Sequence, residues 1–383
     1  GGNPRHVLLM VPYQYVLYTM DPTIFLNYGL LRPVSSIIPE GSLVNPKYPA
    51  AVGMRSLGVM RLQSCLMGAF TQALPDLIPA GQGDGGPLIN VRTTDTKTGR
   101  KLMANLNPIT GGAGATTFRD GTEGSGAYFS FLKNTPVEIN EAEVPVKILR
   151  YGLAQDSGGA GYWRGGTGTT LKFQTFSPNT TITARNRDRC LFTPWGANGG
   201  GAGKPSSFYL NPGSNREVNL GNTDVVSIDP GDVIEITSAG AGGAGNALAR
   251  DPSRVLKDVQ RRFVSVSAAR DEYGVVIEGG EVDESATLTL REQRGSEANG
   301  DGFGFNAERV EFESTWTESN YRVLIHALLK LPVDWRFFVK HRVFESVENL
   351  RLSGTEVGEE DIKTALRNVA NDYPQISSEL AFV

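Results

Sequence analysis

The sequence predicts an α+β protein with a β-rich middle crossed by glycine loops, flanked by helical segments and followed by a small, mostly helical C-terminal subdomain. Between residues 88 and 237, short β-branched or aromatic runs alternate with Gly, Pro, Asn and Asp, which is typical of strands joined by turns. Most intervening stretches are too short for a crossover helix, so antiparallel pairing is expected. On both sides of this region, apolar residues recur at helical spacing.

The N-terminal region is expected to be helical at two places. Residues 5–20 are apolar and aromatic, and Pro12 should kink or split that helix. Residues 30–46 carry three prolines and indicate an extended segment with turns. Residues 56–74 have apolar positions at helical spacing, with Ser56 as the expected N-cap and Pro75 ending the run.

Strands are expected at 147–154, 170–176, 180–185, 206–210 and 232–237. Helices return after residue 245. Asp251 is expected to cap a helix that starts with Pro252 and runs to about Arg262. A short helix at 265–272, a strand at 274–278 and an Asp-capped helix at 283–293 should follow.

A polar, glycine-rich link at 294–302 predicts a boundary between a domain at 1–293 and a subdomain at 303–383. Helices are expected at 318–330 and 357–371 of the subdomain. The run DWRFFVKHR at 334–342 has the aromatic and cationic content of a membrane or nucleic-acid face. Aromatics with intervening charges more often form a subdomain core with basic ends that extend into solvent.

Composition excludes several classes of function. No run of about 18 apolar residues is present, so no transmembrane helix is expected. The net charge of −4, without a basic stripe, argues against general nucleic-acid binding. The only cysteines, Cys65 and Cys190, cannot build a disulfide framework, which favours a reduced, cytoplasmic compartment. Three histidines are too few for a His-rich metal site, so no metal ligands are predicted in this chain.

The 46 glycines are clustered, and two clusters resemble nucleotide-binding loops. GAGGAG at 240–245 fits G-x-G-x-x-G, but no βαβ unit surrounds it. It is better explained as a turn that lets a strand run close to a partner or ligand. An anion bound at the N-terminus of the following helix is an open alternative. NGGGAGKPS at 198–206 nearly matches a Walker A loop, but Asn198 replaces a glycine and Pro205 replaces the Ser/Thr. Any ATP site is therefore expected on another subunit.

Two further stretches concentrate polar groups. In RNRDRC at 185–190, alternate residues of a strand would point three arginines to one face, where they could clamp a carboxylate or phosphate. A solvated edge strand explains the same pattern equally well. In QDSGGAGYWRGGTG at 155–168, Asp156, Ser157 and Arg164 lie among glycines, with no Ser-His-Asp arrangement nearby.

Five stretches occur together in one order: 27–55 (NYGLLRPVSS…), 111–121 (GGAGATTFRDG), 134–166 (NTPVEINEAE…), 187–206 (RDRCLFTPWG…) and 249–277 (ARDPSRVLKD…). Together they resemble the hydantoinase B/5-oxoprolinase family, which includes the acetone carboxylase α subunits. The resemblance covers about residues 3–291.

The resemblance implies the catalytic B-type subunit of a cytoplasmic hetero-oligomer. A hydantoinase A-type partner would bind ATP and activate the carbonyl of a cyclic amide, such as 5-oxoproline or a hydantoin, before hydrolysis. Two alternatives remain: carboxylation of a ketone, as in acetone carboxylase, and a non-catalytic assembly module. The extension at 303–383 leans toward the carboxylase branch, whose α subunits are longer.

Members of that family carry Asn-Asp-Pro-Tyr and His-x-x-Asp segments upstream that supply metal ligands, and this chain has neither. We therefore expect the chain to be the C-terminal portion of a longer subunit, with the divalent metal in the N-terminal part. We also expect it to act only together with that part and with its ATPase partner.

Motif density assigns the candidate site residues. Asp120 and Asp156 would orient a partner group, while Arg164 and Arg185 would hold negative charge. The glycine loops would turn backbone N–H groups toward an oxyanion or a phosphorylated substrate. The candidate substrate-binding residues are Gly111, Gly112, Gly114, Ser157, Gly158, Gly159, Asp188 and Arg189.

Overall fold

The computed structural model describes the chain except for residues 1–12, 14, 15, 18, 19, 22, 26, 36, 39–44, 50–52, 54, 84, 86, 107, 108, 126–133, 186, 296–301 and 381–383. Most of the helix expected at 5–20 and about half of the segment at 30–46 lie outside the described residues. The chain divides into two compact units, Gly1–Asn306 and Ala307–Val383.

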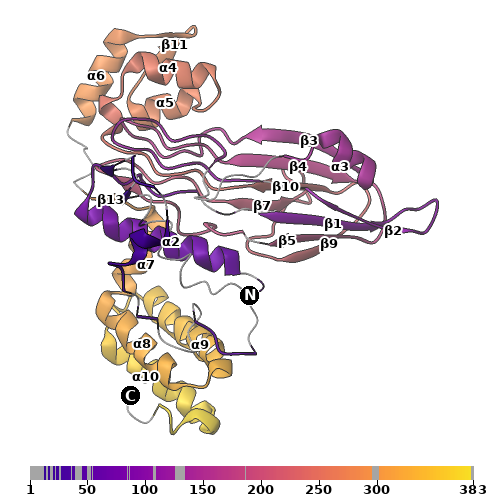
Figure 1. The fold of residues 1–383 in the computed structure, drawn as a ribbon, viewed down its shortest axis with the longest axis vertical. Helices are drawn as coiled ribbons and strands as arrows, with labels where there is room; N and C mark the ends of the chain where they lie inside the picture. Colours follow the sequence, from indigo (N-terminus) through magenta and orange to yellow (C-terminus); the bar gives the residue numbers. More distant parts are fainter. Residues whose placement is uncertain are drawn as a thin grey trace. The chain divides into compact units, whose positions relative to one another are not determined.

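The first unit contains two antiparallel sheets that lie as layers (Figure 1). One sheet has the order β2-β1-β5-β9, with β2 at Lys101–Asn105, β1 at Leu88–Thr94, β5 at Thr180–Arg185 and β9 at Val225–Ile228. The other has the order β3-β4-β10-β7-β8, with β3 at Val146–Leu153, β4 at Thr169–Thr175, β10 at Val233–Thr237, β7 at Ser207–Leu210 and β8 at Val218–Asn219. The five expected strands are thus confirmed.

The apolar side chains of the two sheets form one core. Burial alternates along β1 and β10, as expected for strands with one face turned inward. Val91 pairs with Ile182 in one sheet, and Ile234 pairs with Phe173 in the other. All four are fully buried in the same cluster, and each such side chain contributes roughly 1.5–3 kcal/mol by leaving water.

Helices flank the sheets. Helix α2 spans Arg55–Ala73 and ends before Pro75 as predicted, but it begins before Ser56, which is therefore not its N-cap. Helix α3 spans Val137–Glu143, and the 3-10 helices η1 and η2 span Tyr28–Leu31 and Ala247–Ala249. The short strands β6 (Gly196–Ala197) and β13 (Phe303–Gly304) pair with each other.

The region after η2 follows the predicted order. Helix α4 (Pro252–Gln260) is capped by Asp251 and stops before Arg262, which has φ 60°. Helix α5 (Val266–Tyr273) ends at Gly274 with φ 62°, so the expected strand at 274–278 shortens to β11, Ile277–Glu278, paired with β12, Glu281–Val282. Helix α6 (Glu284–Arg294) has the predicted Asp283 cap.

Extended glycine-rich segments pack side by side through their backbones. Gly83 donates to the Gly112 carbonyl at 2.8 Å, and Ala241 donates to the Gly166 carbonyl at 3.0 Å. A Cβ atom on Gly112 would lie 1.8 Å from the Gly166 oxygen, so no larger residue fits without a backbone shift. We call the segments 80–83, 111–121, 157–168, 195–203 and 239–245 the glycine layer. GAGGAG belongs to it, and its close approach is to the backbone of the same chain, not to the partner or ligand that the sequence suggested.

The second unit is helical, with α7 at Ala307–Thr315, α8 at Glu318–Lys330, α9 at Val333–Leu352, α10 at Glu359–Asp372 and the 3-10 helix η3 at Pro374–Ile376. The helices expected at 318–330 and 357–371 are confirmed. Within the run at 334–342, Trp335 and Phe338 pack against this unit's core, whereas Phe337 is 73% exposed. In the part of the chain that is described, no helix combines the length and the apolar character needed to cross a membrane.

Candidate functional site

Two buried arginines stand at the border between the glycine layer and helices α4 and α5. Arg164 and Arg250 are 2% and 1% exposed. Trp163 bridges to Ala244 and so places Arg164, while Arg250 follows η2 just before the Asp251 cap. Local structure therefore carries both side chains inward.

Carboxylates from two distant segments neutralise these arginines. Arg250 donates to both oxygens of Asp120, at 2.7 and 2.9 Å, and to Asp258 Oδ2 at 2.8 Å. Arg254 Nη2 donates to Asp120 Oδ2 at 2.9 Å. Arg164 pairs with Glu123, and its Nε lies 3.5 Å from Asp258 Oδ2. We call Asp120, Glu123, Arg164, Arg250, Arg254 and Asp258 the ionic cluster.

The ionic cluster stabilises the charged forms of Asp120 and Arg164. Burial alone raises the pKa of Asp120, but the bonds from Arg250 outweigh it and hold that pKa below its ordinary value. Burial alone lowers the pKa of Arg164, but Asp258 and Glu123 raise it above its ordinary value. Tyr273 is buried beside them, and burial raises the pKa of its hydroxyl, which has no hydrogen-bond partner among the described residues.

The structure thus brings two predicted catalytic residues together, since the Arg164 amide also donates to Asp120 Oδ1 at 2.7 Å. Groups that stay charged across the neutral range make poor general acids or bases. The contacts instead join the loops at 111–123 and 157–168 to α4. Sequence reasoning missed three members of the cluster, which are Arg250, Arg254 and Asp258 of the 249–277 stretch. Three charged residues around a predicted helix start are the sequence pattern that could have indicated them.

Asp156 and Ser157 have local structural partners. Asp156 has φ 62° and accepts from the Ser265 amide at 2.6 Å, where Ser265 caps α5. The Ser157 hydroxyl donates to the Ala154 carbonyl at 2.7 Å and accepts from the Gly168 amide at 2.9 Å. Both residues hold the start of the 157–168 segment in place.

The candidate glycines lie inside the glycine layer: a Cβ on Gly111, Gly112, Gly114, Gly158 or Gly159 would collide with neighbouring backbone. The Gly112 amide donates to the Ala239 carbonyl at 3.1 Å, and the Gly159 amide donates to the Ala241 carbonyl at 2.8 Å. These two N–H groups are therefore already used within the fold, and in this structure they do not face an oxyanion site.

Neither interpretation of 185–190 holds: the three-arginine clamp is wrong in geometry, and β5 lies between β1 and β9, so it is not an edge strand. Strand β5 ends at Arg185, which is exposed, so the later arginines share no strand face with it. Arg187 is buried and donates to the carbonyls of Ala184, Gly221 and Thr223. Arg189 has φ 57°, which reverses the chain direction locally.

Asp188 and Arg189 contact helix α2 instead. Asp188 Oδ2 lies 2.8 Å from Arg61 Nε, and the Arg189 guanidinium reaches the Ser64 hydroxyl at 3.4 Å. Arg189 also lies over the Trp195 ring, 5.9 Å from its centroid. These contacts hold α2 beside the 195–203 segment.

The near-Walker stretch does not form a phosphate loop. It leads into strand β7 rather than into a helix, so no helix N-terminus faces a phosphate. The Lys204 ammonium pairs with Glu272 at 2.9 Å. The residues present do not fit a nucleotide, in agreement with the interpretation of the sequence.

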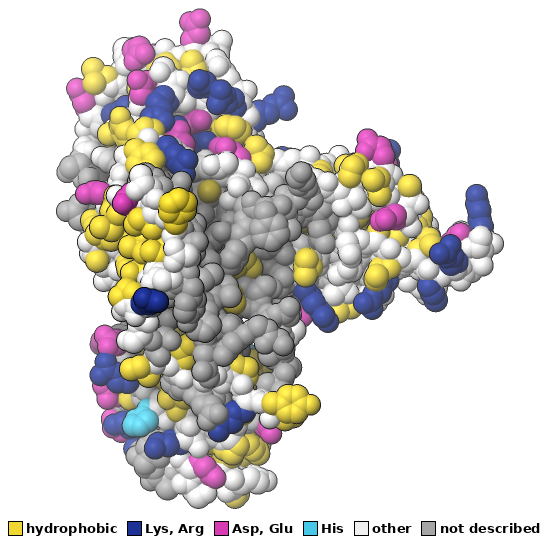
Figure 2. All heavy atoms as spheres, in the orientation of Figure 1, with side chains coloured by type: hydrophobic (Ala, Val, Ile, Leu, Met, Phe, Trp, Pro, Cys, Tyr) yellow, Lys and Arg dark blue, Asp and Glu magenta, His cyan; other side chains and the backbone are white. Residues whose placement is uncertain are grey.

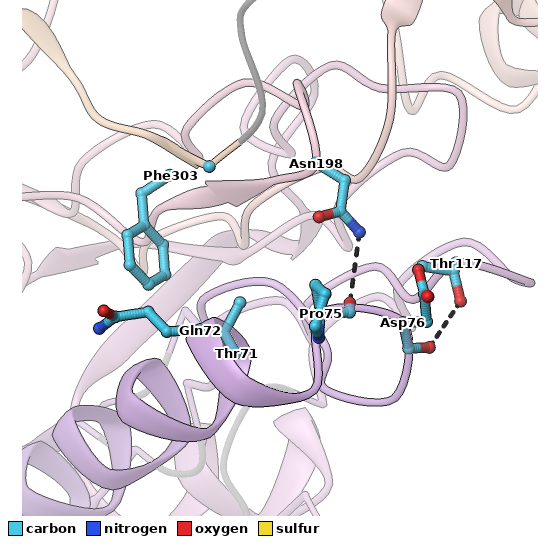
Figure 3. Close-up of a pocket in the computed structure, with 8 residues that line it drawn as sticks. Thr71, Gln72, Pro75, Asp76, Thr117, Asn198 and Phe303 are labelled. Carbon is cyan, nitrogen blue, oxygen red and sulfur yellow. Dashed lines mark hydrogen bonds between the residues drawn. The ribbon is translucent and has the colours of Figure 1, made fainter.

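A cleft of about 740 Å³ opens where α2 ends (Figure 3). Thr117 of the 111–121 segment donates to the Asp76 carbonyl at 2.8 Å, and Asn198 donates to the Pro75 carbonyl at 3.3 Å. In Figure 3 the Asn198 side-chain oxygen turns away from Pro75, toward the side where Phe303 lies. The lining residues are Thr71, Gln72, Pro75, Asp76, Thr117, Asn198, Gly302 and Phe303.

The described cleft lining is polar, with one negatively charged and no positively charged side chain. Its described lining has a carboxylate, two carboxamides, two hydroxyls and an aromatic ring, but no lysine or arginine. The C-terminal end of α2 adds a partial negative charge. A ligand with N–H donors suits this lining, whereas an anion would find no cation there. Sequence reasoning missed the cleft because Asp76 and Phe303 lie far from the motifs that supply Thr117 and Asn198.

Among the described residues, no group of three or more His, Cys, Asp or Glu side chains is arranged to hold a metal ion. The side chains present therefore do not fit the divalent metal that the family resemblance implies, and we assign no step on these residues to a metal.

Comparison with known proteins supports the family resemblance that the order of the motifs suggested. Residues 4–247 match the model of the family described as hydantoinase B/oxoprolinase. The B subunit of a putative D-/L-hydantoinase from Pseudomonas sp. (strain NS671) is 28% identical over 282 residues, covering 71% of this chain and 46% of that protein. The beta subunit of caprolactamase from Pseudomonas jessenii is 33% identical over 282 residues, covering 69% of this chain and 47% of that protein.

A solved structure supports the same relationship. The crystal structure of ATP-dependent caprolactamase from Pseudomonas jessenii superposes with a TM-score of 0.62 and 28% identity, over 76% of this chain and 51% of that one. The chain spans less than half the length of these two curated relatives. The family model covers well over half of the chain, so the protein belongs to the hydantoinase B/oxoprolinase family.

Proposed function

We propose that this chain is part of the catalytic B-type subunit of an ATP-dependent, multi-subunit hydrolase of cyclic amides. The observation that carries the proposal is its similarity to the B subunit of a hydantoinase and the beta subunit of a caprolactamase, both named for cyclic-amide chemistry. Because similarity transfers function by analogy, the cleft supplies a separate, chemical argument.

The cleft at the end of α2 suits a cyclic amide. Such a ring presents an N–H donor, which the Asp76 carboxylate or the Asn198 oxygen would accept, and an apolar edge, which the Phe303 ring would contact. A neutral lactam or hydantoin loses no charge-solvating water on entering this lining. Carboxylate-bearing 5-oxoproline would meet Asp76 without a compensating cation, so neutral rings are the favoured substrates.

Carbonyl activation is assigned to the partner. An amide is a poor electrophile, and phosphoryl transfer from ATP to its oxygen, with release of ADP, makes its carbon more electrophilic. Water then adds to that carbon, and the ring C–N bond breaks as the nitrogen takes up a proton and leaves as an amine. The acyl phosphate that remains is hydrolysed by a second water to the open-chain acid and phosphate. The described residues offer no phosphate loop for the nucleotide. We therefore place ATP on an A-type subunit and any divalent metal on protein outside the described residues.

Ring opening by the assembled complex tests the function. We would combine the complex containing this chain and an A-type subunit with caprolactam, hydantoin or 5-oxoproline, with and without ATP, and quantify the open-chain acids by mass spectrometry. ATP-dependent ring opening is expected, with neutral rings preferred. No ring opening from an assembled complex would refute the proposal. Acetone-dependent incorporation of labelled bicarbonate would instead assign the carboxylase activity. If the complex catalysed neither reaction, an assembly role would remain for this chain.

The cleft is tested separately by Asp76→Asn, which replaces a charged acceptor by a neutral one of the same shape. Replacing a charge-assisted hydrogen bond by a neutral one, a loss of about 1–1.5 kcal/mol, should raise KM for a neutral ring about five- to tenfold, with little change in kcat. Glu138→Gln on exposed α3 is the matched control and should leave KM unchanged. An unchanged KM in both variants would remove the cleft from substrate binding while leaving the reaction itself in place.

A further inference from the structure

The hairpin formed by β1 and β2 extends past the sheet to which it belongs. Strand β5 pairs with β1 over Leu88–Arg92, whereas the β1–β2 ladder continues to Thr94 and Lys101. The end of the hairpin is therefore a two-stranded ribbon, seen at the far end of the sandwich in Figure 1. We call residues 92–101 the hairpin tip.

The hairpin tip is cationic in a chain that is acidic overall. Arg92, Lys97, Arg100 and Lys101 are all exposed, and dark blue side chains gather at this end of the molecule in Figure 2. None of the four lies within ion-pair distance of a carboxylate in the described part of the chain, whose full sequence has a net charge of −4.

The one carboxylate of the tip has a structural role. Asp95 accepts from the Lys97 amide at 2.9 Å and from the Thr98 hydroxyl at 2.6 Å. Its own amide donates to the Arg100 carbonyl at 2.9 Å, and Gly99 takes the positive φ of 70° that the turn needs. Asp95 thus folds the turn and also interacts with the charge of Lys97, so the tip, with four cations and one carboxylate, keeps a net charge of +3.

Two simpler explanations do not account for this charge. Cations on an edge strand prevent edge-to-edge pairing, and β2 is an edge strand. That function explains Lys101, but Arg92 lies on β1, which is flanked on both sides, and Lys97 and Arg100 lie in the turn. Single-stranded nucleic acid would need aromatic side chains for base stacking, and residues 92–101 contain none.

We propose that the hairpin tip docks on an acidic surface of the partner subunit. The partner is the A-type subunit, so its identity rests on the proposed function, whereas its chemistry follows from the four displayed cations. Complementary charge on two subunits accelerates encounter and fixes their register. A ribbon that projects from a rigid sandwich reaches such a surface without rearrangement of the core.

Charge reversal at the tip tests the docking. The tip variant carries Arg92→Glu, Lys97→Glu, Arg100→Glu and Lys101→Glu. A control makes the same change in net charge at four exposed cations elsewhere on the first unit, which are Lys147, Lys257, Arg261 and Arg270. Circular dichroism and thermal melting would verify that both variants fold.

The readout is the Kd of each protein for the purified A-type subunit, measured by interferometry at 50 and 300 mM salt. We expect the tip variant to bind at least about tenfold more weakly than wild type, and the control to stay within about twofold. Wild-type affinity should fall at the higher salt as screening increases. At saturating partner, ring opening by the tip variant should match wild type, because the tip is not part of the cleft.

Several outcomes would overturn the docking proposal. These are equal affinities for wild type and tip variant, equal weakening by the control, or no binding of wild type to the A-type subunit. Tip-dependent binding of a single-stranded 30-mer DNA or of phosphatidylserine vesicles, with none to the subunit, would also overturn it. If tip-dependent assembly is seen but no ring opens, the docking stands and the proposed function fails.

Discussion

Replacing Arg250 by methionine tests whether the ionic cluster holds the first unit together. Arg250 is 1% exposed and donates to Asp120, to Asp258 and, at 2.7 Å, to the Tyr162 carbonyl. Methionine fills most of the space of the arginine stem but removes the charge and every donor. The change therefore isolates the electrostatic contribution from packing.

The magnitude follows from what is left unpaired. Asp120 keeps Arg254 and the Arg164 amide, but Asp258, whose side chain is 8% exposed, keeps only an Arg164 nitrogen at 3.5 Å. Leaving a buried charge without its partner typically costs 3–5 kcal/mol, and we expect a loss of about that size in the free energy of unfolding of the first unit. Adding Asp258→Asn should recover part of this loss, since it removes the stranded charge.

Urea unfolding, followed by hydrogen exchange at the amides of α4, measures the loss in the correct unit. Lys204→Met is the control, because the Lys204 side chain is 53% exposed and pairs at 2.9 Å with Glu272, which is also solvent-accessible. Such a surface pair is worth about 0–1 kcal/mol. A loss for Arg250→Met no larger than that for Lys204→Met, or no recovery on adding Asp258→Asn, would refute the assignment of a stabilising role.

Three further predictions concern other parts of the molecule. The pKa of Asp120 is lower in the folded protein than its ordinary value of 3.8. The ionised carboxylate therefore stabilises the fold above pH 3.8, and this stabilisation is lost as pH falls through the pKa of the folded state. Asp120→Asn should flatten the loss of stability measured below about pH 4. Gly112→Ala should destabilise the first unit by at least about 1–3 kcal/mol, because the added Cβ would clash with Gly166. Gly58→Ala, at an open position within α2, should stabilise it by up to about 1 kcal/mol. Thermal melting of both variants would contradict this if both melting temperatures shifted in the same direction. Trp316→Ala should cost the second unit about 3–5 kcal/mol, since Trp316 stacks on Phe344 at 4.3 Å; unchanged hydrogen exchange in α9 would contradict it.

Local patterns predicted local structure well. Alternating β-branched residues located β4, β5 and β10, and an aspartate before the helical run located the caps of α4 and α6. The β1–β2 hairpin was not singled out, because its strands carry as many polar as apolar residues and its turn is highly charged. The expectation of a strand through all three arginines is wrong because β5 ends at Arg185, and Arg189 has a left-handed φ of 57°.

The ionic cluster could not be predicted from the spacing of residues in the sequence, for a physical reason. Arg250 and Asp120 are 130 positions apart, and a buried ion pair leaves no periodic trace in either segment. The cleft is similar, since Asn198 and Pro75 are 123 positions apart. Family motifs came closest, because the quoted stretches contain Asp120, Arg164, Arg250 and Asp258 even where single residues were misassigned.

The structure of the glycine layer explains why the proposed substrate site lies at its rim and not within it. Glycines were predicted to turn free N–H groups toward an oxyanion, but the amides of Gly112, Gly159, Gly165 and Gly166 donate to backbone carbonyls of the layer or its loops. A layer built from backbone alone has few side chains to fix its register, so the ionic cluster at its edge takes over that task. The described cleft lining then supplies acceptors for an N–H group and only neutral donors for the carbonyl oxygen. Under the proposed function, activation of the substrate carbonyl is assigned to groups outside the described residues, and an ATP-binding partner docked on this chain would supply them.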